Sequence, residues 1–75
     1  MEMTVQNDQV MIHVRFAPNG SVTEISERPP AESAQAWFNR LSDKAGTHYQ
    51  PLSGGRGLFR LTRGAVDALK ATTAN

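Results

Sequence analysis

An alternating strand followed by an asparagine–glycine pair does most to limit what this chain can fold into. Between Val10 and Phe16, apolar residues occupy every second position, which is the period of a strand with one buried face. Asn19 and Gly20 follow closely, and this pair is the strongest short hairpin signal because both residues tolerate positive φ. The sequence therefore predicts a β-hairpin that starts at Val10.

A two-residue loop at Asn19-Gly20 fixes which residues of the hairpin face one another. The predicted pairs are Phe16 with Thr23, Val14 with Ile25, Ile12 with Glu27, Arg15 with Glu24, and His13 with Ser26. The first three pairs lie on one face and the last two on the other. We therefore expect a mainly apolar face that packs on the core and a polar, charged face.

A helical repeat follows the hairpin. Pro29 ends the second strand because it donates no ladder hydrogen bond, and Pro30 suits the first turn of a helix, so we expect the helix to begin there. Apolar residues then recur at helical spacing, at Ala34, Trp37, Phe38, Leu41 and Ala45. This stripe predicts a helix with one buried side, and Gly46 is placed to end it as a C′ glycine.

The second half of the chain repeats the order of two strands and a helix. The predicted elements are a strand over Thr47–Leu52, a glycine-rich turn over Ser53–Gly57, a strand over Leu58–Leu61 and a helix over Arg63–Ala71. Pro51 either restricts the first of these strands to a sheet edge or marks its end, and Thr62 is a suitable N-cap for the helix. In the last strand, Phe59 and Leu61 are expected to face the core.

These elements predict an α+β fold in the order ββαββα, with one antiparallel four-stranded sheet and two helices packed on one face. The other face of the sheet then stays open. Besides Glu24, Arg60 and Leu58, the residues expected there as partner contacts are Met11, His13, Arg15 and Tyr49. Such a mixed polar and apolar surface is the first place to look for a partner.

The length of 75 residues allows a single domain, which we expect to span residues 10–71 between a flexible tail at 1–9 and a frayed end at 72–75. The chain has no cysteine, so neither disulfides nor thiolate metal sites can stabilise a small core, and pairing with a second copy is a reasonable alternative. No stretch approaches the ~20 apolar residues of a membrane span, and no secretory signal is recognisable. We expect a cytoplasmic protein without membrane contact.

The charges are unevenly divided along the chain. Residues 1–33 hold two basic and five acidic residues, whereas residues 34–75 hold six basic and two acidic residues. A division of this kind is typical of nucleic-acid binding or of two faces that complement each other across a dimer. The overall net charge of +1 speaks against strong nonspecific affinity for DNA.

Four cations near the C-terminus form the candidate anion-binding or partner-binding site: Arg56, Arg60, Arg63 and Lys70. Free N–H groups at the start of the second helix attract phosphate or carboxylate, and arginine can bind either with two parallel hydrogen bonds. The competing interpretation is that these cations are solvated or paired with the acidic half of the same chain. The sequence leaves both interpretations open.

No motif for catalysis, metal binding or cofactor binding is recognisable. Gly54–Gly57 has the spelling GxxG of an RNA-binding loop, but it lies between predicted strands rather than helices, and it lacks the ending of a nucleotide-binding P-loop. His13 and His48 have no ligand spacing around them, and no serine has the context of a nucleophile. Among the aromatic residues, only Tyr49 is expected to be exposed enough to stack on a base. We therefore expect no enzyme, no metal and no cofactor.

The sequence thus predicts a small non-catalytic protein-interaction module, either accessory, inhibitory or homodimerising, that uses the open sheet face and the edge carrying Arg56, Arg60 and Arg63. The alternative is a nucleic-acid-binding or regulatory domain in which these arginines and Lys70 contact phosphates. The partner is then a protein, a second copy of the chain, or a nucleic acid.

Overall fold

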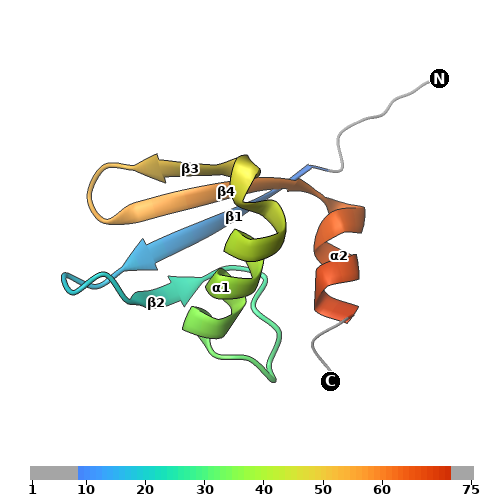
Figure 1. The fold of residues 1–75 in the computed structure, drawn as a ribbon, viewed down its shortest axis with the longest axis horizontal. Coiled ribbons are helices and arrows are strands. Elements are labelled where there is room, and N and C mark those ends of the chain that lie inside the picture. The colour runs from blue at the N-terminus through green and yellow to red at the C-terminus, as the bar shows by residue number, and fades with distance from the viewer. Residues whose placement is uncertain (1–8, 72–75) are drawn as a thin grey trace.

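Four antiparallel strands form one sheet in the order β2-β1-β4-β3 in a computed structural model, which describes residues 9–71 (Figure 1). The elements are β1 (Gln9–Phe16), β2 (Val22–Ile25), α1 (Ala34–Ala45), the 3-10 turn η1 (Gly46–His48), β3 (Tyr49–Leu52), β4 (Arg56–Thr62) and α2 (Arg63–Ala71). The predicted ββαββα order and α+β class are confirmed. Gln9, assigned above to a flexible tail, is the first residue of β1, while the predicted ends at 1–8 and 72–75 lie outside the described residues.

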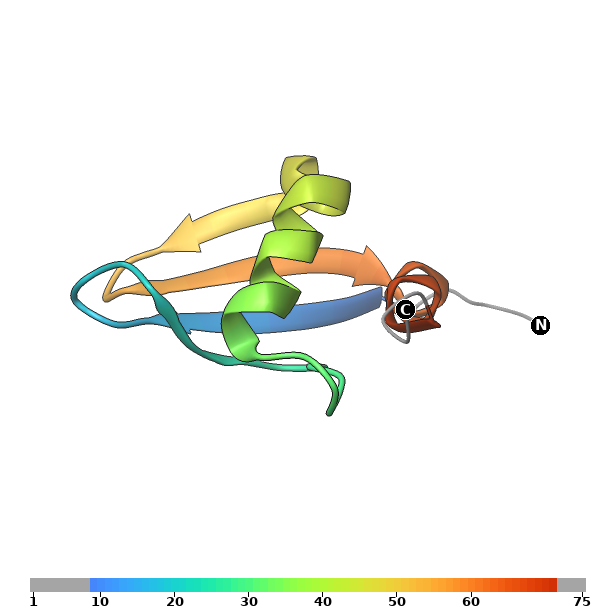
Figure 2. The ribbon, with the colours of Figure 1, turned by 60° about the horizontal axis from the view of Figure 1, so that its bottom comes forward.

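The two helices occupy different positions relative to the sheet. Helix α1 crosses one face, whereas α2 lies beyond the ends of β1 and β4 (Figures 1 and 2). Over residues 9–71, neither helix covers the opposite face, which is therefore open as expected. Neither helix is long and apolar enough to cross a membrane.

One hydrophobic core joins the sheet to both helices. Its largest fully buried side chains are Trp37, Phe59, Ile12, Leu41 and Val66. At roughly 1.5 to 3 kcal/mol for each large buried side chain, this cluster is the main source of stability. Because Val66 belongs to it, α2 packs against the same core as α1 even though it does not cross the sheet.

The hairpin between β1 and β2 has a longer loop than predicted. Gly20 N–H donates to the carbonyl of Ala17, and Ala17 N–H donates to the carbonyl of Ser21, both at 2.8 Å. Gly20 has a φ of 90°, whereas Asn19 does not have positive φ. The loop is therefore a three-residue connection with a single left-handed glycine, a common alternative to the predicted two-residue turn.

A bulge in β2 then restores the predicted register. The longer loop pairs Phe16 with Val22, not with Thr23, but the register shifts before the next pair, and Arg15 lies opposite Glu24 as expected. Thr23 is the extra residue. Val22 and Ile25 are both buried although they are three positions apart, a spacing that puts residues of a regular strand on opposite faces. The bulge allows both to reach the core.

The predicted pairing of Ile12 with Glu27 also fails, as that of Phe16 with Thr23 does. Strand β2 ends at Ile25, and Ser26 makes the last cross-strand contacts: its N–H donates to the carbonyl of His13 at 3.1 Å, and its hydroxyl accepts from His13 N–H at 2.9 Å. The Ser26 carbonyl accepts instead from the indole N–H of Trp37 at 3.2 Å. Glu27 then leaves the sheet with a φ of 65°.

Helix α1 begins and ends differently from the prediction. It starts at Ala34, because Ser33 is its N-cap and accepts a 3.1 Å hydrogen bond from Ala36 N–H. Pro29 and Pro30 precede it in a turn. Gly46 has a right-handed φ of −60° and leads into η1, so it does not act as a left-handed C′ glycine.

The second hairpin follows the prediction more closely. Strand β3 pairs only with β4, so the strand that contains Pro51 is an edge strand, although η1 delays its start to Tyr49. Gly54 and Gly55 have φ values of 79° and 72° in the turn, and β4 is longer than expected. The hydroxyl of Thr62 accepts from Ala65 N–H at 3.1 Å, which confirms the predicted cap of α2.

Candidate functional site

The open face is formed mainly by the two central strands. On β1 and β4, exposed residues alternate with residues that face the core. Three cross-strand pairs lie on the open side: Arg15 with Arg56, His13 with Leu58, and Met11 with Arg60. Met11 is 51% exposed and is the one large hydrophobic residue exposed within residues 9–71. The predicted positions of Met11, His13, Arg15 and Arg60 on this face agree with the register.

Leu58 gives this face an apolar centre. It belongs to the open side by its alternation with Gly57 and Phe59, yet only 6% of it is exposed. Its cross-strand partners are His13 on β1 and Gln50 on β3. A nearly buried leucine flanked by an exposed methionine and two arginines is a mixed surface of the kind that proteins use for binding one another.

A hollow of about 460 Å³ lies at the end of this face where β2, β1, β4 and β3 all contribute. It is lined by His13, Val14, Arg15, Glu24, Ile25, Ser26, Leu52, Arg56 and Gly57. Two of these residues are arginines and one is a carboxylate. Val14, Ile25 and Leu52 add apolar atoms, so the hollow has a mixed lining with an excess of positive charge.

The structure separates the four predicted anion-binding residues into two pairs. Arg56 and Arg60 are exposed on the open face, and no carboxylate within residues 9–71 lies in ion-pair distance of either. Arg63 and Lys70 lie on α2 and both contact Glu27. Arg63 and Lys70 therefore have a carboxylate partner within the chain, which Arg56 and Arg60 lack among residues 9–71.

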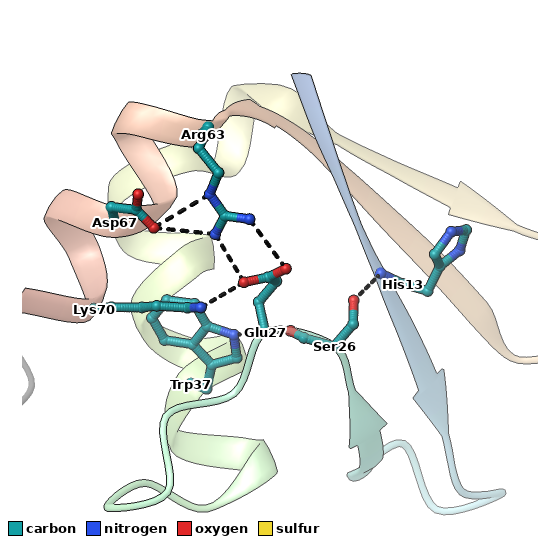
Figure 3. Close-up of polar contacts among 7 residues, drawn as sticks. All are labelled: His13, Ser26, Glu27, Trp37, Arg63, Asp67 and Lys70. Carbon is teal, nitrogen blue, oxygen red and sulfur yellow. Dashed lines mark hydrogen bonds and ion pairs between the residues drawn. The ribbon is translucent and has the colours of Figure 1, made fainter. Parts of the chain in front are cut away.

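Glu27 is the anion that Arg63 and Lys70 bind in this structure (Figure 3). Its Oε1 lies 2.8 Å from Nη2 of Arg63 and 2.5 Å from Nζ of Lys70, and its Oε2 lies 3.4 Å from Nη1 of Arg63. Asp67 contacts the same arginine at 3.1 Å. The hydrogen bonds from Arg63 and then Lys70 lower the pKa of Glu27 from 4.5 to about 2.

A second ion pair joins the same regions of the chain. Glu32 Oε2 lies 3.1 Å from Nε of Arg40, whose guanidinium also donates to the carbonyl of Leu69 and lies 5.8 Å from the centre of the Trp37 ring. Arg40 therefore connects α1 to the segment before it and to α2.

These contacts account for much of the uneven charge along the sequence. Glu27 and Glu32 come from the acidic first part, and their partners Arg40, Arg63 and Lys70 come from the basic second part. Half of the six basic residues in the second part thus pair with the acidic part of the same chain. The sequence did not predict the pairing of Glu32 with Arg40, and Glu27 was expected to lie in the second strand, opposite Ile12.

Tyr49 does not lie on the open face, contrary to the prediction. It pairs with Phe59, and its ring contacts Phe59 at 4.9 Å and Phe38 at 6.0 Å between ring centres. Phe38 also packs edge-to-face on Phe16. The prediction failed because the register of β3 against β4 places Tyr49 opposite Phe59, on the helix side. On the open face of the described sheet there is consequently no Phe, Tyr or Trp side chain, and His13 has the one aromatic ring there.

Residues that could bind a metal ion are not gathered within the described part of the chain. No three histidine, aspartate or glutamate side chains of residues 9–71 lie close enough together to hold one. His13 is exposed on β1, and His48 is exposed at the end of η1.

Comparison of the chain with protein-family models, with curated proteins and with solved structures found no match.

Proposed function

We propose that the protein is a small non-catalytic interaction module that binds a protein partner through the open sheet face. The observation that carries this proposal is the contrast among its cations. Arg63 and Lys70 are paired with Glu27, whereas Arg56 and Arg60 share the uncovered face with exposed Met11 and have no carboxylate partner within residues 9–71. Unpaired arginines beside apolar side chains are the composition of protein-binding surfaces.

The alternative, a nucleic-acid-binding domain, receives less support from this surface. Proteins that bind single strands on a sheet stack the bases on aromatic side chains, and Tyr49 is packed on the helix side instead. Of the four cations proposed to contact phosphates, Arg63 and Lys70 already bind Glu27. Phosphate contacts by Arg56 and Arg60 alone provide two of the four expected.

Site-specific photo-crosslinking in cells tests the proposal. A photoreactive amino acid replaces Met11 on the open face, and the control carries it at Ser42, an exposed position of α1. We expect a discrete protein adduct from position 11 and none from position 42. An adduct of twice the chain's mass identifies a second copy as the partner.

Two results would contradict the proposal. One is the absence of adducts at position 11, or identical adducts at both positions, which shows that the open face has no specific partner. The other is an adduct at position 11 that nuclease treatment removes, which supports the nucleic-acid alternative. In that case the affinity should also fall steeply with salt, with a log–log slope of about one per phosphate contact.

A further inference from the structure

The hollow on the open face contains two arginines in an unusual relation. Arg15 and Arg56 are direct partners in the β1–β4 ladder, and directly opposed like charges destabilise a sheet. Arg15 has one partial counter-charge, Glu24, at 3.7 Å, and both side chains are highly exposed. Arg56 donates only to the carbonyl of Ser53, at 3.2 Å. Within the described residues, this pair therefore carries an excess of positive charge.

The surroundings of the two arginines suit a peptide better than a free ion. The hollow has a volume of about 460 Å³, which falls in the range of roughly 300 to 1,000 Å³ typical of ligand sites and far exceeds one carboxylate group. Leu52 provides an apolar wall, and Ser26 provides a hydroxyl whose hydrogen is available to donate. An occupant with both carboxylate and apolar groups matches this lining.

We propose that the hollow receives an acidic segment of the partner protein, in which one carboxylate binds between Arg15 and Arg56 and a neighbouring apolar side chain contacts Leu52. Glu24 repels a carboxylate from the β2 side and so directs it toward Arg56. A two-fold contact with a second copy that is centred on this pair is disfavoured, because it would bring the arginines of the two copies together. The inference rests on the proposed function and names the chemistry of its partner.

The test measures binding of a fluorescently labelled peptide of alternating glutamate and leucine to the full chain by anisotropy at low salt. A matched peptide with glutamine in place of glutamate is the control. We expect the acidic peptide alone to bind, and Arg15→Ala or Arg56→Ala to weaken it by about tenfold or more, since each removes a charge-assisted hydrogen bond. Arg56→Lys keeps the positive charge, so it should weaken peptide binding less than Arg56→Ala does.

Lys44→Ala provides the matched protein control, because Lys44 is an exposed cation on α1, away from the open face, and is paired with Asp43 at 3.6 Å. We expect this variant to bind like the unaltered chain. Three results overturn the inference. The two peptides bind equally, Lys44→Ala and Arg56→Ala lose the same affinity for the acidic peptide, or neither arginine variant loses affinity for it. Tighter binding of inorganic phosphate or of an unstructured oligonucleotide that competes with the peptide also overturns it.

The experiment separates failure of the inference from failure of the proposed function. When crosslinks from position 11 persist in the Arg15→Ala and Arg56→Ala variants, the open face has a partner but the hollow does not recognise it through carboxylates. Circular dichroism and the melting temperature of each variant establish that a loss of binding is not a loss of folding.

Discussion

Nη2 of Arg63 lies 2.8 Å from Oε1 of Glu27, although the two residues are 36 positions apart. The contact joins the first residue of α2 to the turn that follows β2. A cation in the first turn of a helix is opposed by the helix dipole, and the carboxylates of Glu27 and Asp67 offset this. Helix α2 is therefore held at the end of the sheet by ion pairs as well as by buried Val66.

Removing the Glu27 charge should destabilise the protein. Glu27→Gln leaves Arg63 and Lys70 without their shared carboxylate, and we expect a loss of about 1 to 2 kcal/mol in the free energy of unfolding. Urea denaturation measures it. The matched control is Glu24→Gln, which removes an exposed carboxylate 3.7 Å from Arg15 and should cost less than about 0.5 kcal/mol. Equal losses in the two variants contradict the interpretation.

The Glu27 contribution should depend on pH in one direction. The pKa of Glu27 is lowered from 4.5 to about 2 by hydrogen bonds from Arg63 and Lys70, so the folded protein holds this carboxylate charged where the unfolded chain protonates it. The stabilisation is complete above pH 4.5 and is lost as the pH falls toward 2. The difference in unfolding free energy between the unaltered chain and Glu27→Gln should therefore shrink over that interval. A difference that stays constant or grows on acidification refutes this assignment.

Gly57 should not tolerate a side chain. A Cβ at this position would lie 2.1 Å from the Tyr49 hydroxyl and 2.6 Å from two of its ring carbons, and the ring is held by Phe38 and Phe59. We expect Gly57→Ala to cost about 1 to 3 kcal/mol by overpacking, as measured by thermal or urea denaturation.

Two comparisons make this expectation specific. Gly64 lies in α2 and has no atom within 4 Å of a built Cβ, so Gly64→Ala should instead stabilise the protein by about 0.5 to 1 kcal/mol. In a Tyr49→Ala background, Gly57→Ala should lose most of its cost because the clashing ring is gone. A cost that persists in that background points to the backbone of Gly57 and not to Tyr49.

Deletion of Thr23 should be tolerated. Because Thr23 is the extra residue of the bulge, its removal leaves Val22 opposite Phe16 and brings the existing pair of Arg15 and Glu24 into a regular ladder. We expect a cost below about 1.5 kcal/mol, partly from the lost hydrogen bond between the Thr23 hydroxyl and the Arg15 carbonyl. Deletion of Met11 is the contrasting case. It shifts the residues before it by one position, which moves their side chains to the opposite face of the sheet and should prevent folding. Amide NMR spectra distinguish the two outcomes.

The pattern of apolar residues predicted the elements and their buried sides with few errors. Val10, Ile12, Val14 and Phe16 face the core, and so do Trp37 and Leu41 at their helical spacing. Local signals also located the cap at Thr62 and the glycine turn before β4. The missed bulge had a visible sign, because Val22 and Ile25 are both apolar at a spacing that a regular strand cannot bury on one face.

The candidate site was only partly predictable. The open-face positions of Met11, His13, Arg15 and Arg60 followed from alternation along β1 and β4. Arg56 was assigned to the glycine-rich turn, and its place on this face became visible only because β4 begins there. Tyr49 was misplaced because its side depends on the register of β3 against β4, which pairs it with Phe59. The pairing of Arg63 and Lys70 with Glu27 could not be read from the chain, since nothing local indicates that Glu27 adopts positive φ.

The amino-acid sequence by itself determined the order of strands and helices and which side of each is apolar, because these properties depend on residues a few positions apart. The tertiary structure decided which charges neutralise one another and which remain for a partner. Electrostatic attraction depends on distance in space, and only the packing of α2 against the end of the sheet brings Arg63 and Lys70 to Glu27 while Arg56 and Arg60 stay on the opposite, uncovered face.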